Sequence, residues 1–252
     1  MRRRLALLLL ALAPVAARAE VPTVAARVLR TYPHDPRAFT EGLFWHGGYL
    51  YESTGEPGRS FIRKVDLATG RVLAQATIAA PTFGEGIVPW GDQIVSLTWQ
   101  DHKGWRWSLG ELKRLSEWQY PGEGWALTSD GHSLIMSDGT PELRFLDPAT
   151  LKERHRLTVT ADGKPVAQLN ELEWVDGEIL ANVWQTDFIA RIDPGTGHVV
   201  GWIDLRALHR RMGYADSDAV PNGIAWDAAG RRLFVTGKDW PTMFQIAPPK
   251  GR

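Results

Sequence analysis

The sequence predicts an all-β fold, a single five-bladed β-propeller closed by its N-terminal strand. Three observations predict it: a segment that recurs five times, a succession of β-rich runs after each copy, and one strand left over near the N-terminus. The five copies, called repeat heads below, are FTEGLFW (39–45), FGEGIVPW (83–90), GEGWAL (122–127), LNELEW (169–174) and PNGIAW (221–226). Matched at Glu41, Glu85, Glu123, Asn170 and Asn222, they recur at intervals of 44, 38, 47 and 52 residues. This period is close to the roughly 40 to 50 residues of known propeller blades.

Each repeat head is followed by the other strands of a blade. A turn and a second β-rich run with alternating apolar residues come next, at 49–54, 93–99, 133–140, 178–186 and 232–240. Third and fourth strands are clearest in 60–78, 143–159 and 188–205, where Asp-x-x-Thr-Gly or Asp-Pro-x-Thr forms the hairpin turn. Four strands per repeat are typical of a propeller blade.

The N-terminal strand is expected to close the ring. The fifth repeat ends soon after 243–249 and leaves space for three strands, whereas 23–32 forms a strand without a repeat of its own. Completing the last blade with this strand removes two exposed sheet edges. The alternative is a less regular β-sandwich or barrel. Most tryptophans are expected to pack between the sheets, among them Trp45, Trp90, Trp174 and Trp226.

The first 20 residues have the features of an export signal. Three arginines precede an apolar run from Leu5 to about Leu12, and Ala17-Arg18-Ala19 fits the small-x-small rule for signal-peptidase cleavage. We therefore expect a signal peptide over 1–19 and one mature propeller domain over 20–252, located in the periplasm or secreted. The chain has no cysteine, which excludes disulfides and thiolate metal sites.

Composition narrows the class of partner. The 29 basic and 29 acidic residues give a formal charge of zero, and no basic stripe follows the first few residues, so nucleic acid is not an expected partner. No later segment approaches the ~18 apolar residues of a membrane span, so no membrane contact is expected after signal cleavage. Small molecules or peptides are the expected partners, and we expect a monomer.

Polar and aromatic residues at matching repeat positions converge on one place. The first strand of each propeller blade lines the central channel, whose mouth is the usual ligand site. This rule places five side chains around one axis: Glu41, Glu85, Trp125, Asn170 and Asn222. Three more follow a repeat head by 14 to 16 residues in different blades and so occupy equivalent places: Trp99, Trp184 and Lys238. Taken singly, each residue also has a structural reading as a turn, core or surface residue; together they form an apolar cup with one cation.

Motifs along the mature chain resemble those of a known family. They include YPHDPRAFTEGL, FGEGI, LTW, GWALTSDG, SDGT, WQTDFIARI, NGIAWD and FVTGKDWP, in this order. Together they resemble the glutamine cyclotransferase family, the plant and bacterial type of glutaminyl cyclase, over about residues 27 to 246. The resemblance implies a five-bladed propeller, which agrees with the fold that the repeats predict.

The resemblance also implies an activity and a set of site residues. Family members convert the N-terminal glutamine of peptides or proteins to pyroglutamate and release ammonia. The family's acid/base glutamate corresponds to Glu85, with Phe83 as its aromatic neighbour. The aromatic walls correspond to Trp99, Trp125 and Trp184, and the polar partners correspond to Asn170 and Lys238. Glu41 stands where relatives often have Gln, so it would act as a substrate ligand in a different way, by attracting the substrate ammonium.

The implied chemistry suits these residue types. The α-amine of the substrate attacks its own γ-amide, so the enzyme needs no nucleophile and only has to move a proton and stabilise charge. A single carboxyl group, Glu85, can take the amine proton and deliver it to the leaving nitrogen. Apolar rings would raise its pKa, which Lys238 would oppose. Asn170 and Lys238 can hydrogen-bond the γ-carbonyl oxygen as it becomes an oxyanion.

No cofactor is expected, and two other functions remain open. The seven histidines form no H-E-x-x-H motif or close ligand pair, so catalytic zinc is not expected, although a structural cation in the channel remains open. One alternative is a periplasmic propeller that binds a peptide or sugar without catalysis, because fold alone does not determine function. The other is a metal-dependent propeller hydrolase.

Overall fold

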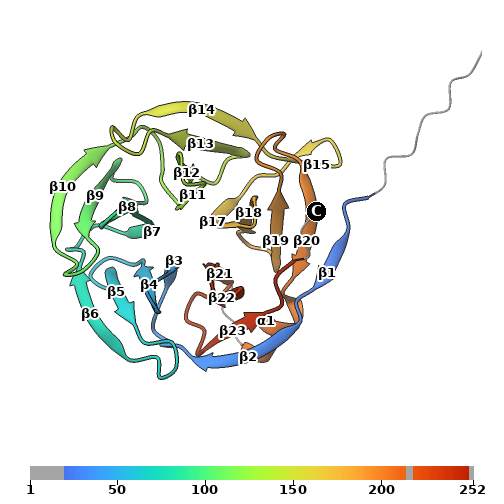
Figure 1. Ribbon diagram of the computed structural model, residues 1–252, viewed down its shortest axis with the longest axis horizontal. Helices are drawn as coiled ribbons and strands as arrows, with labels where there is room; N and C mark the ends of the chain where they lie inside the picture. Colours follow the sequence, from blue (N-terminus) through green and yellow to red (C-terminus); the bar gives the residue numbers. More distant parts are fainter. Residues whose placement is uncertain (1–19, 214–217, 250–252) are drawn as a thin grey trace, which may run out of the picture.

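Five β-sheets are arranged around a central axis in the computed structural model, which describes residues 20–213 and 218–249 (Figure 1). The predicted signal peptide, residues 1–19, lies outside the described residues. Blade 1 contains β3 (Thr40–His46), β4 (Tyr49–Thr54), β5 (Phe61–Val65) and β6 (Val72–Thr77). Blade 2 contains β7 (Gly84–Trp90), β8 (Gln93–Thr98), β9 (Lys103–Ser108) and β10 (Arg114–Gln119). Blade 3 contains β11 (Ala126–Ser129), β12 (Leu134–Ser137), β13 (Glu142–Leu146) and β14 (Glu153–Thr158).

The last two blades share the N-terminal segment. Blade 4 contains β17 (Leu169–Val175), β18 (Glu178–Val183), β19 (Phe188–Ile192) and β20 (Val199–Asp204), and blade 5 contains β21 (Pro221–Asp227), β22 (Arg232–Gly237) and β23 (Thr242–Ile246). Consecutive strands within each blade pair antiparallel, and the first strand of each blade lies innermost (Figure 1). The fold is therefore the predicted five-bladed propeller, and the β-sandwich or barrel alternative is wrong.

The closing strand differs in detail from the prediction. Residues 23–32 form two strands rather than one: β1 (Thr23–Ala25) pairs parallel with β20 of blade 4, and β2 (Val28–Pro33) pairs antiparallel with β23 of blade 5. The break lies at Ala26 and Arg27, where the chain passes from one blade to the next. The N-terminal segment thus completes blade 5 as expected and also adds a fifth strand to blade 4.

Three short elements lie outside the blade pattern and were not predicted. A small hairpin of β15 (Thr160–Ala161) and β16 (Lys164–Pro165) precedes blade 4, and helix α1 (Arg206–Met212) follows it. The helix ends at Gly213 in the left-handed conformation that commonly terminates helices.

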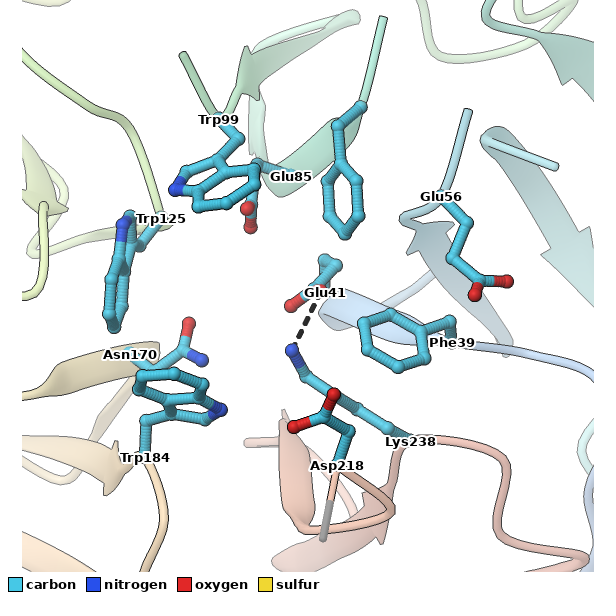
Figure 2. A pocket seen from close by; sticks show the side chains of 11 residues that line it. Phe39, Glu41, Glu56, Glu85, Trp99, Trp125, Asn170, Trp184, Asp218 and Lys238 are labelled. Carbon is cyan, nitrogen blue, oxygen red and sulfur yellow. Dashed lines mark hydrogen bonds and ion pairs between the residues drawn. The ribbon is translucent and has the colours of Figure 1, made fainter. Parts of the chain in front are cut away.

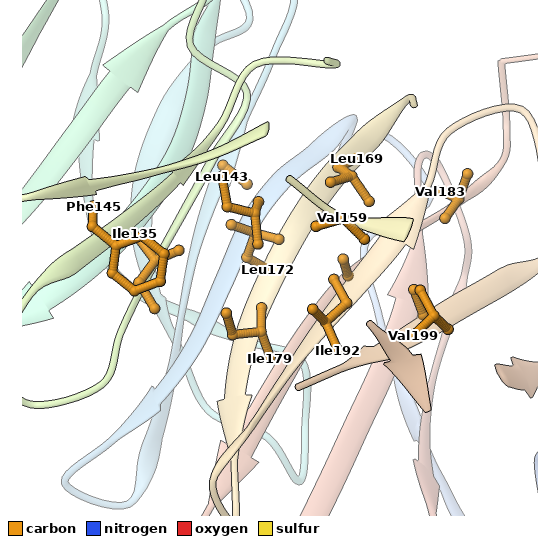
Figure 3. Packing of buried hydrophobic residues seen from close by; sticks show 13 residues of the cluster. Ile135, Leu143, Phe145, Val159, Leu169, Leu172, Ile179, Val183, Ile192 and Val199 are labelled. Atoms are coloured by element: carbon orange, nitrogen blue, oxygen red, sulfur yellow. The ribbon is translucent and has the colours of Figure 1, made fainter. Parts of the chain in front are cut away.

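Apolar residues fill the space between neighbouring blades. One cluster lies at each of the five blade junctions, and Figure 3 shows the one between blades 3 and 4, with Leu143 and Phe145 facing Leu172 and Ile179. Trp45, Trp90, Trp174 and Trp226 each pack at such a junction, as predicted. This arrangement explains why strands inside a blade have apolar residues on both faces, because a neighbouring blade covers each side.

The junction of blades 5 and 1 also holds a buried ionic group, called the closure cluster: His34, Glu52 and Arg63. The His34 Nε2 lies 2.8 Å from Glu52 Oε1, and Arg63 Nε donates to Glu52 Oε2 at 2.8 Å. His34 Nδ1 lies 2.5 Å from the Trp240 carbonyl oxygen, and Thr40 donates its hydroxyl to Glu52 at 2.7 Å. Because both ring nitrogens face oxygens that accept, His34 is held as an imidazolium.

Candidate active site

Four of the five repeat heads carry a polar side chain in a β-bulge of the innermost strand. The pairing register shifts between Thr40 and Gly42 in blade 1, and at the corresponding place in blades 2, 4 and 5. The first residues of these bulges are Glu41, Glu85, Asn170 and Asn222. A bulge commonly redirects a side chain next to a functional site.

Blade 3 lacks the bulge, and in this blade Glu123 is not equivalent to Glu41, Glu85, Asn170 and Asn222, as the repeat alignment had assumed. Strands β11 and β12 pair without a register shift, and β11 begins only at Ala126. Glu123, the matching point in this repeat, therefore lies before the channel strand and does not line the channel mouth. Trp125 occupies the place at the axis instead, as predicted.

Hydroxyl groups from neighbouring blades hold two of the bulges. Ser53 of β4 donates to the backbone oxygen of Glu85 at 2.6 Å, and Ser137 of β12 donates to that of Asn170 at 2.8 Å. Both hydroxyls are fully buried. The backbone that carries Glu85 is thereby fixed to blade 1, and the backbone that carries Asn170 is fixed to blade 3.

The second set of predicted residues also occupies equivalent positions. Trp99, Trp184 and Lys238 directly follow β8, β18 and β22. The backbone N–H of each donates to the residue just before its blade's first strand, at 3.2, 2.8 and 3.0 Å. In blade 1 this position is Gly55, where a Cβ atom would lie 2.3 Å from the Phe83 ring. The glycine therefore leaves room for Phe83 beside the cavity.

A cavity of about 300 Å³ opens where these side chains meet (Figure 2). All eight predicted site residues line it: Glu41, Phe83, Glu85, Trp99, Trp125, Asn170, Trp184 and Lys238. Three further lining residues were not predicted: Phe39, Glu56 and Asp218. Phe39 directly precedes a channel strand, as Phe83 does, so the repeat alignment contained a signal for it.

Glu41 and Lys238 form a buried ion pair at one side of the cavity. The Lys238 Nζ lies 2.7 Å from Glu41 Oε1 and 4.4 Å from the centre of the Phe39 ring. Asn222, which does not line the cavity, donates to Glu41 Oε2 at 3.0 Å and so helps to hold the Glu41 carboxylate in place. Burial raises the pKa of Glu41 to about 7, although Lys238 opposes the change.

Glu85 and Asn170 present unpaired polar atoms to the same cavity. Glu85 is 6% exposed and Asn170 is 4% exposed. Within the described residues, neither Glu85 Oε2 nor Asn170 Oδ1 has a hydrogen-bond partner. Burial raises the pKa of Glu85 well above its ordinary value, and the nearby Glu41 adds to the increase while Lys238 opposes it. A buried carboxyl group with a raised pKa is suited to both accepting and donating a proton.

Aromatic rings form an arc around the cavity. Phe39 contacts Phe83 edge-on with ring centres 6.1 Å apart, and Phe83 contacts Trp99 at 5.6 Å. On the other side, Trp125 and Trp184 meet edge-on at 5.6 Å. The arc supplies apolar surface beside Glu85 and the Glu41–Lys238 pair, which a small substrate group needs.

Neither a metal site nor a membrane span is found in the part of the chain that the structure covers. Among residues 20–213 and 218–249, no group of three or more His, Asp or Glu side chains is placed to hold a metal ion. In the same residues no helix is long and apolar enough to cross a membrane. A metal-independent reaction stays a prediction that chelation can test.

Comparisons with known proteins agree on one family. A family model described as glutamine cyclotransferase matches residues 3–247. The chain is 43% identical over 224 residues to a glutaminyl-peptide cyclotransferase of Arabidopsis thaliana, which covers 87% of this chain and 70% of the relative. It also resembles the crystal structure of Myxococcus xanthus glutaminyl cyclase, with a TM-score of 0.85, 36% identity, and coverage of 90% of this chain and 97% of that chain.

Proposed function

The chain belongs to the glutamine cyclotransferase family, and from its site we propose that it converts the N-terminal glutamine of peptides to pyroglutamate, with Glu85 moving the proton. The reaction class rests on the family, and the residue roles rest on the cavity. Membership in a family of enzymes favours catalysis over a propeller that only binds a ligand.

The observation that carries the proposal is the pair of unpaired acceptors at the cavity. Buried polar atoms in folded proteins nearly always have a partner, so Glu85 Oε2 and Asn170 Oδ1 indicate where a ligand with N–H donors binds. A glutaminyl residue brings such donors in its α-amine and its amide. Its short aliphatic chain suits the rings of Phe83, Trp99 and Trp125.

The proton moves in two steps through one carboxyl group. The neutral α-amine attacks the γ-carbonyl carbon, a C–N bond forms, and the carbonyl oxygen gains negative charge. Ionised Glu85 takes one proton from the attacking nitrogen and then gives it to the amide nitrogen, whose bond to carbon breaks as ammonia leaves. Atoms and charges balance without a covalent enzyme intermediate. Lys238 and the Asn170 amide can donate to the oxyanion.

In this proposal Glu41 orients Lys238 and balances its positive charge. With Nζ 2.7 Å from Glu41, Lys238 is a cation with a fixed direction rather than a mobile one. It can reach the substrate oxyanion only beside this carboxylate. The pair is neutral overall, so the cavity accepts an uncharged amide side chain without leaving a buried cation uncompensated.

Turnover of a simple peptide tests the function. The mature protein is incubated with a Gln-initiated peptide, and ammonia and the matching loss of mass are measured. The control is the same peptide with an acetylated α-amine, which has no nucleophile. Release of ammonia only from the free peptide supports the proposal, and it should persist under strong zinc chelation. Binding of the free peptide without release of ammonia would instead favour the ligand-binding module.

We also infer that the chain is exported, and this rests on the arginine-rich, apolar segment that ends with Ala17-Arg18-Ala19. Expression of the full chain followed by N-terminal sequencing of the protein outside the cytoplasm should give Glu20 as the first residue. Recovery of Met1 from that fraction would contradict the inference.

A further inference from the structure

One carboxylate joins two tryptophans of the cavity wall. Glu123 Oε2 accepts the indole N–H of Trp99 at 2.8 Å and that of Trp125 at 2.9 Å. Its other oxygen accepts from Gln100 Nε2 at 3.0 Å. Partial burial would raise the pKa of Glu123, but the hydrogen bonds from Trp125, Gln100 and Trp99 outweigh it and lower that pKa. Glu123 is thus an ionised acceptor shared by both rings.

This carboxylate lies at a gap in the aromatic arc. Ring contacts join Phe39 to Phe83, Phe83 to Trp99, and Trp125 to Trp184. In the described part of the chain, the connection between Trp99 and Trp125 is Glu123 rather than a ring contact. In Figure 2 the two indole nitrogens point to the same side, away from Lys238. The cavity therefore receives the faces and C–H edges of these rings, and their donors are occupied elsewhere.

The backbone behind Glu123 is fixed to the segment that carries Trp99. His102 Nδ1 lies 2.7 Å from the Gly122 carbonyl oxygen, and the Gly124 N–H donates to the Trp99 carbonyl oxygen at 3.1 Å. Position 124 has no room for a side chain, because a Cβ atom there would lie 2.5 Å from the Tyr120 hydroxyl oxygen. The acceptor and one of its donors are thus held at a set separation.

We propose that Glu123 is a positioning residue that fixes the ring planes of Trp99 and Trp125 as the substrate wall and keeps their N–H groups away from the bound glutaminyl amide. This inference rests on the proposed function. An indole N–H free to face the cavity would compete with Lys238 and Asn170 for the γ-carbonyl oxygen. Two rings without a common acceptor would also have to be ordered by the substrate on binding.

The proposal predicts a change in binding rather than in chemistry. The wall contacts the substrate equally in the ground state and the transition state, so its loss raises KM and leaves kcat nearly unchanged. For Glu123→Ala we expect KM to rise ~10-fold and kcat to change less than ~3-fold, because two charge-assisted hydrogen bonds are lost at a partly exposed site. Glu123→Gln keeps one oxygen that can accept from both indoles once Gln100 turns its amide, and its KM should rise by less than ~3-fold.

A matched control exists on the outer strand of blade 2. Exposed Glu117 accepts the indole N–H of Trp105 at 3.2 Å, a similar contact that does not line the cavity. Kinetics with a Gln-initiated peptide are measured for Glu123→Ala, Glu123→Gln and Glu117→Gln. In parallel, ¹⁵N spectra follow the indole N–H signals of the 12 tryptophans, with Trp99→Phe and Trp125→Phe used for assignment. If Glu123→Ala does not fold, Glu123→Leu removes the acceptor while retaining most of the volume.

The outcomes separate the inference from the function on which it rests. Support consists of a raised KM in Glu123→Ala, recovery in Glu123→Gln, displaced Trp99 and Trp125 signals, and an unchanged KM in Glu117→Gln. A KM within twofold of the parent in Glu123→Ala would overturn the proposal, as would a fall in kcat alone or a Glu123→Gln variant as impaired as Glu123→Ala. Failure of the parent to release ammonia would refute the proposed function, whereas displaced indole signals in the variants would still establish that Glu123 holds the rings of Trp99 and Trp125.

Discussion

The closure cluster and the mouth cluster, defined as Glu41, Glu85, Asn170 and Lys238, both contain a buried glutamate of blade 1, but their polar atoms are paired differently. In the closure cluster both oxygens of Glu52 accept hydrogen bonds. In the mouth cluster Glu85 Oε2 and Asn170 Oδ1 have no partner within the described residues. Burial of polar groups is therefore common to the two clusters, and incomplete pairing distinguishes the mouth cluster from the closure cluster.

Protonation differs in the same sense between Glu52 of the closure cluster and Glu85 of the mouth cluster. Burial alone would raise the pKa of Glu52, but His34 and Arg63 outweigh it and hold that pKa well below its usual range. For Glu85 burial raises the pKa, and the neighbouring carboxyl of Glu41 raises it further. Glu52 is a fixed anion, whereas Glu85 exchanges its proton at a higher pH than an ordinary carboxyl group. Two buried glutamates thus have opposite uses because their neighbours differ.

The largest expected effect is on turnover, in Glu85→Gln. The amide keeps the size of the side chain but cannot carry a proton, and general acid-base catalysis contributes about 100- to 10,000-fold, so kcat should fall by at least ~100-fold. Thermal stability should be equal to or above that of the parent, because an unpaired buried carboxyl group is removed. Steady-state kinetics and a melting curve measure both. A folded variant with kcat within a few-fold of the parent would refute the shuttle role, and Glu41 would become the next candidate.

Glu52→Gln should show the reverse pattern. It leaves the His34 imidazolium without its counter-charge and Arg63 with Asp35 as its remaining partner, and breaking a buried ion pair costs about 3 kcal/mol or more. We expect the free energy of unfolding to fall by about 3 kcal/mol while kcat of the folded enzyme stays within ~2-fold of the parent. Denaturant unfolding and active-site-normalised kinetics test this. If stability were unchanged, the closure cluster would not hold the ring.

Repetition in the sequence explains why much of this could be predicted. Side chains at similar offsets in different blades occupy equivalent places, and offsets of 14 to 16 residues from the repeat heads located Trp99, Trp184 and Lys238. The β-bulges were not predicted, because a bulge changes the ladder by one residue and leaves no periodic signal. The split between β1 and β2 depends on which sheet edges are free, and this is known only once the ring has closed.

Glu123 shows the other limit of prediction from sequence. It was used only as a matching point in the repeat, and nothing in GEGWAL indicates that its side chain turns back to Trp99. That contact joins segments 24 residues apart through loop geometry rather than strand periodicity. Asp218 and Glu56 lie in loops as well, so the offsets that located the other cavity residues do not apply to them.

A smaller effect is expected in the pH profile of Glu41→Gln. The catalytic carboxyl must be ionised to accept the amine proton, so activity rises as pH rises through the elevated pKa of Glu85. Removing the Glu41 charge lowers that pKa, since Glu41 raises it and Lys238, no longer neutralised, lowers it further. The acidic limb of kcat/KM should move to lower pH, with kcat at the optimum changed less than ~10-fold. The control is Asn222→Ala, which keeps the Glu41 charge and should leave the acidic limb of kcat/KM where it is in the parent. If that limb did not move in Glu41→Gln, Glu85 would not be the group whose ionisation produces it.

The smallest effect concerns the pH dependence of stability and is the direct test that the closure cluster is fully paired. Burial alone would lower the pKa of His34, but the Coulomb attraction and hydrogen bond of Glu52 outweigh it and raise that pKa above 6.5. A raised folded-state pKa contributes stability that is fully present below pH 6.5 and is lost as pH rises through the folded value. For Glu52 the shift is downward, so its contribution is present above its ordinary pKa of about 4.5 and is lost as pH falls further. The cluster is therefore most stabilising between these two values, and Tm should decline above pH 6.5 by a few degrees, because about 1 kcal/mol moves the Tm of a domain of this size by roughly 2–4 °C.

His34→Gln should abolish this decline, whereas His132→Gln, at an exposed position, should retain it. An identical decline in both variants would mean that His34 is not the group that titrates, and it would contradict the assignment of this decline to the closure cluster.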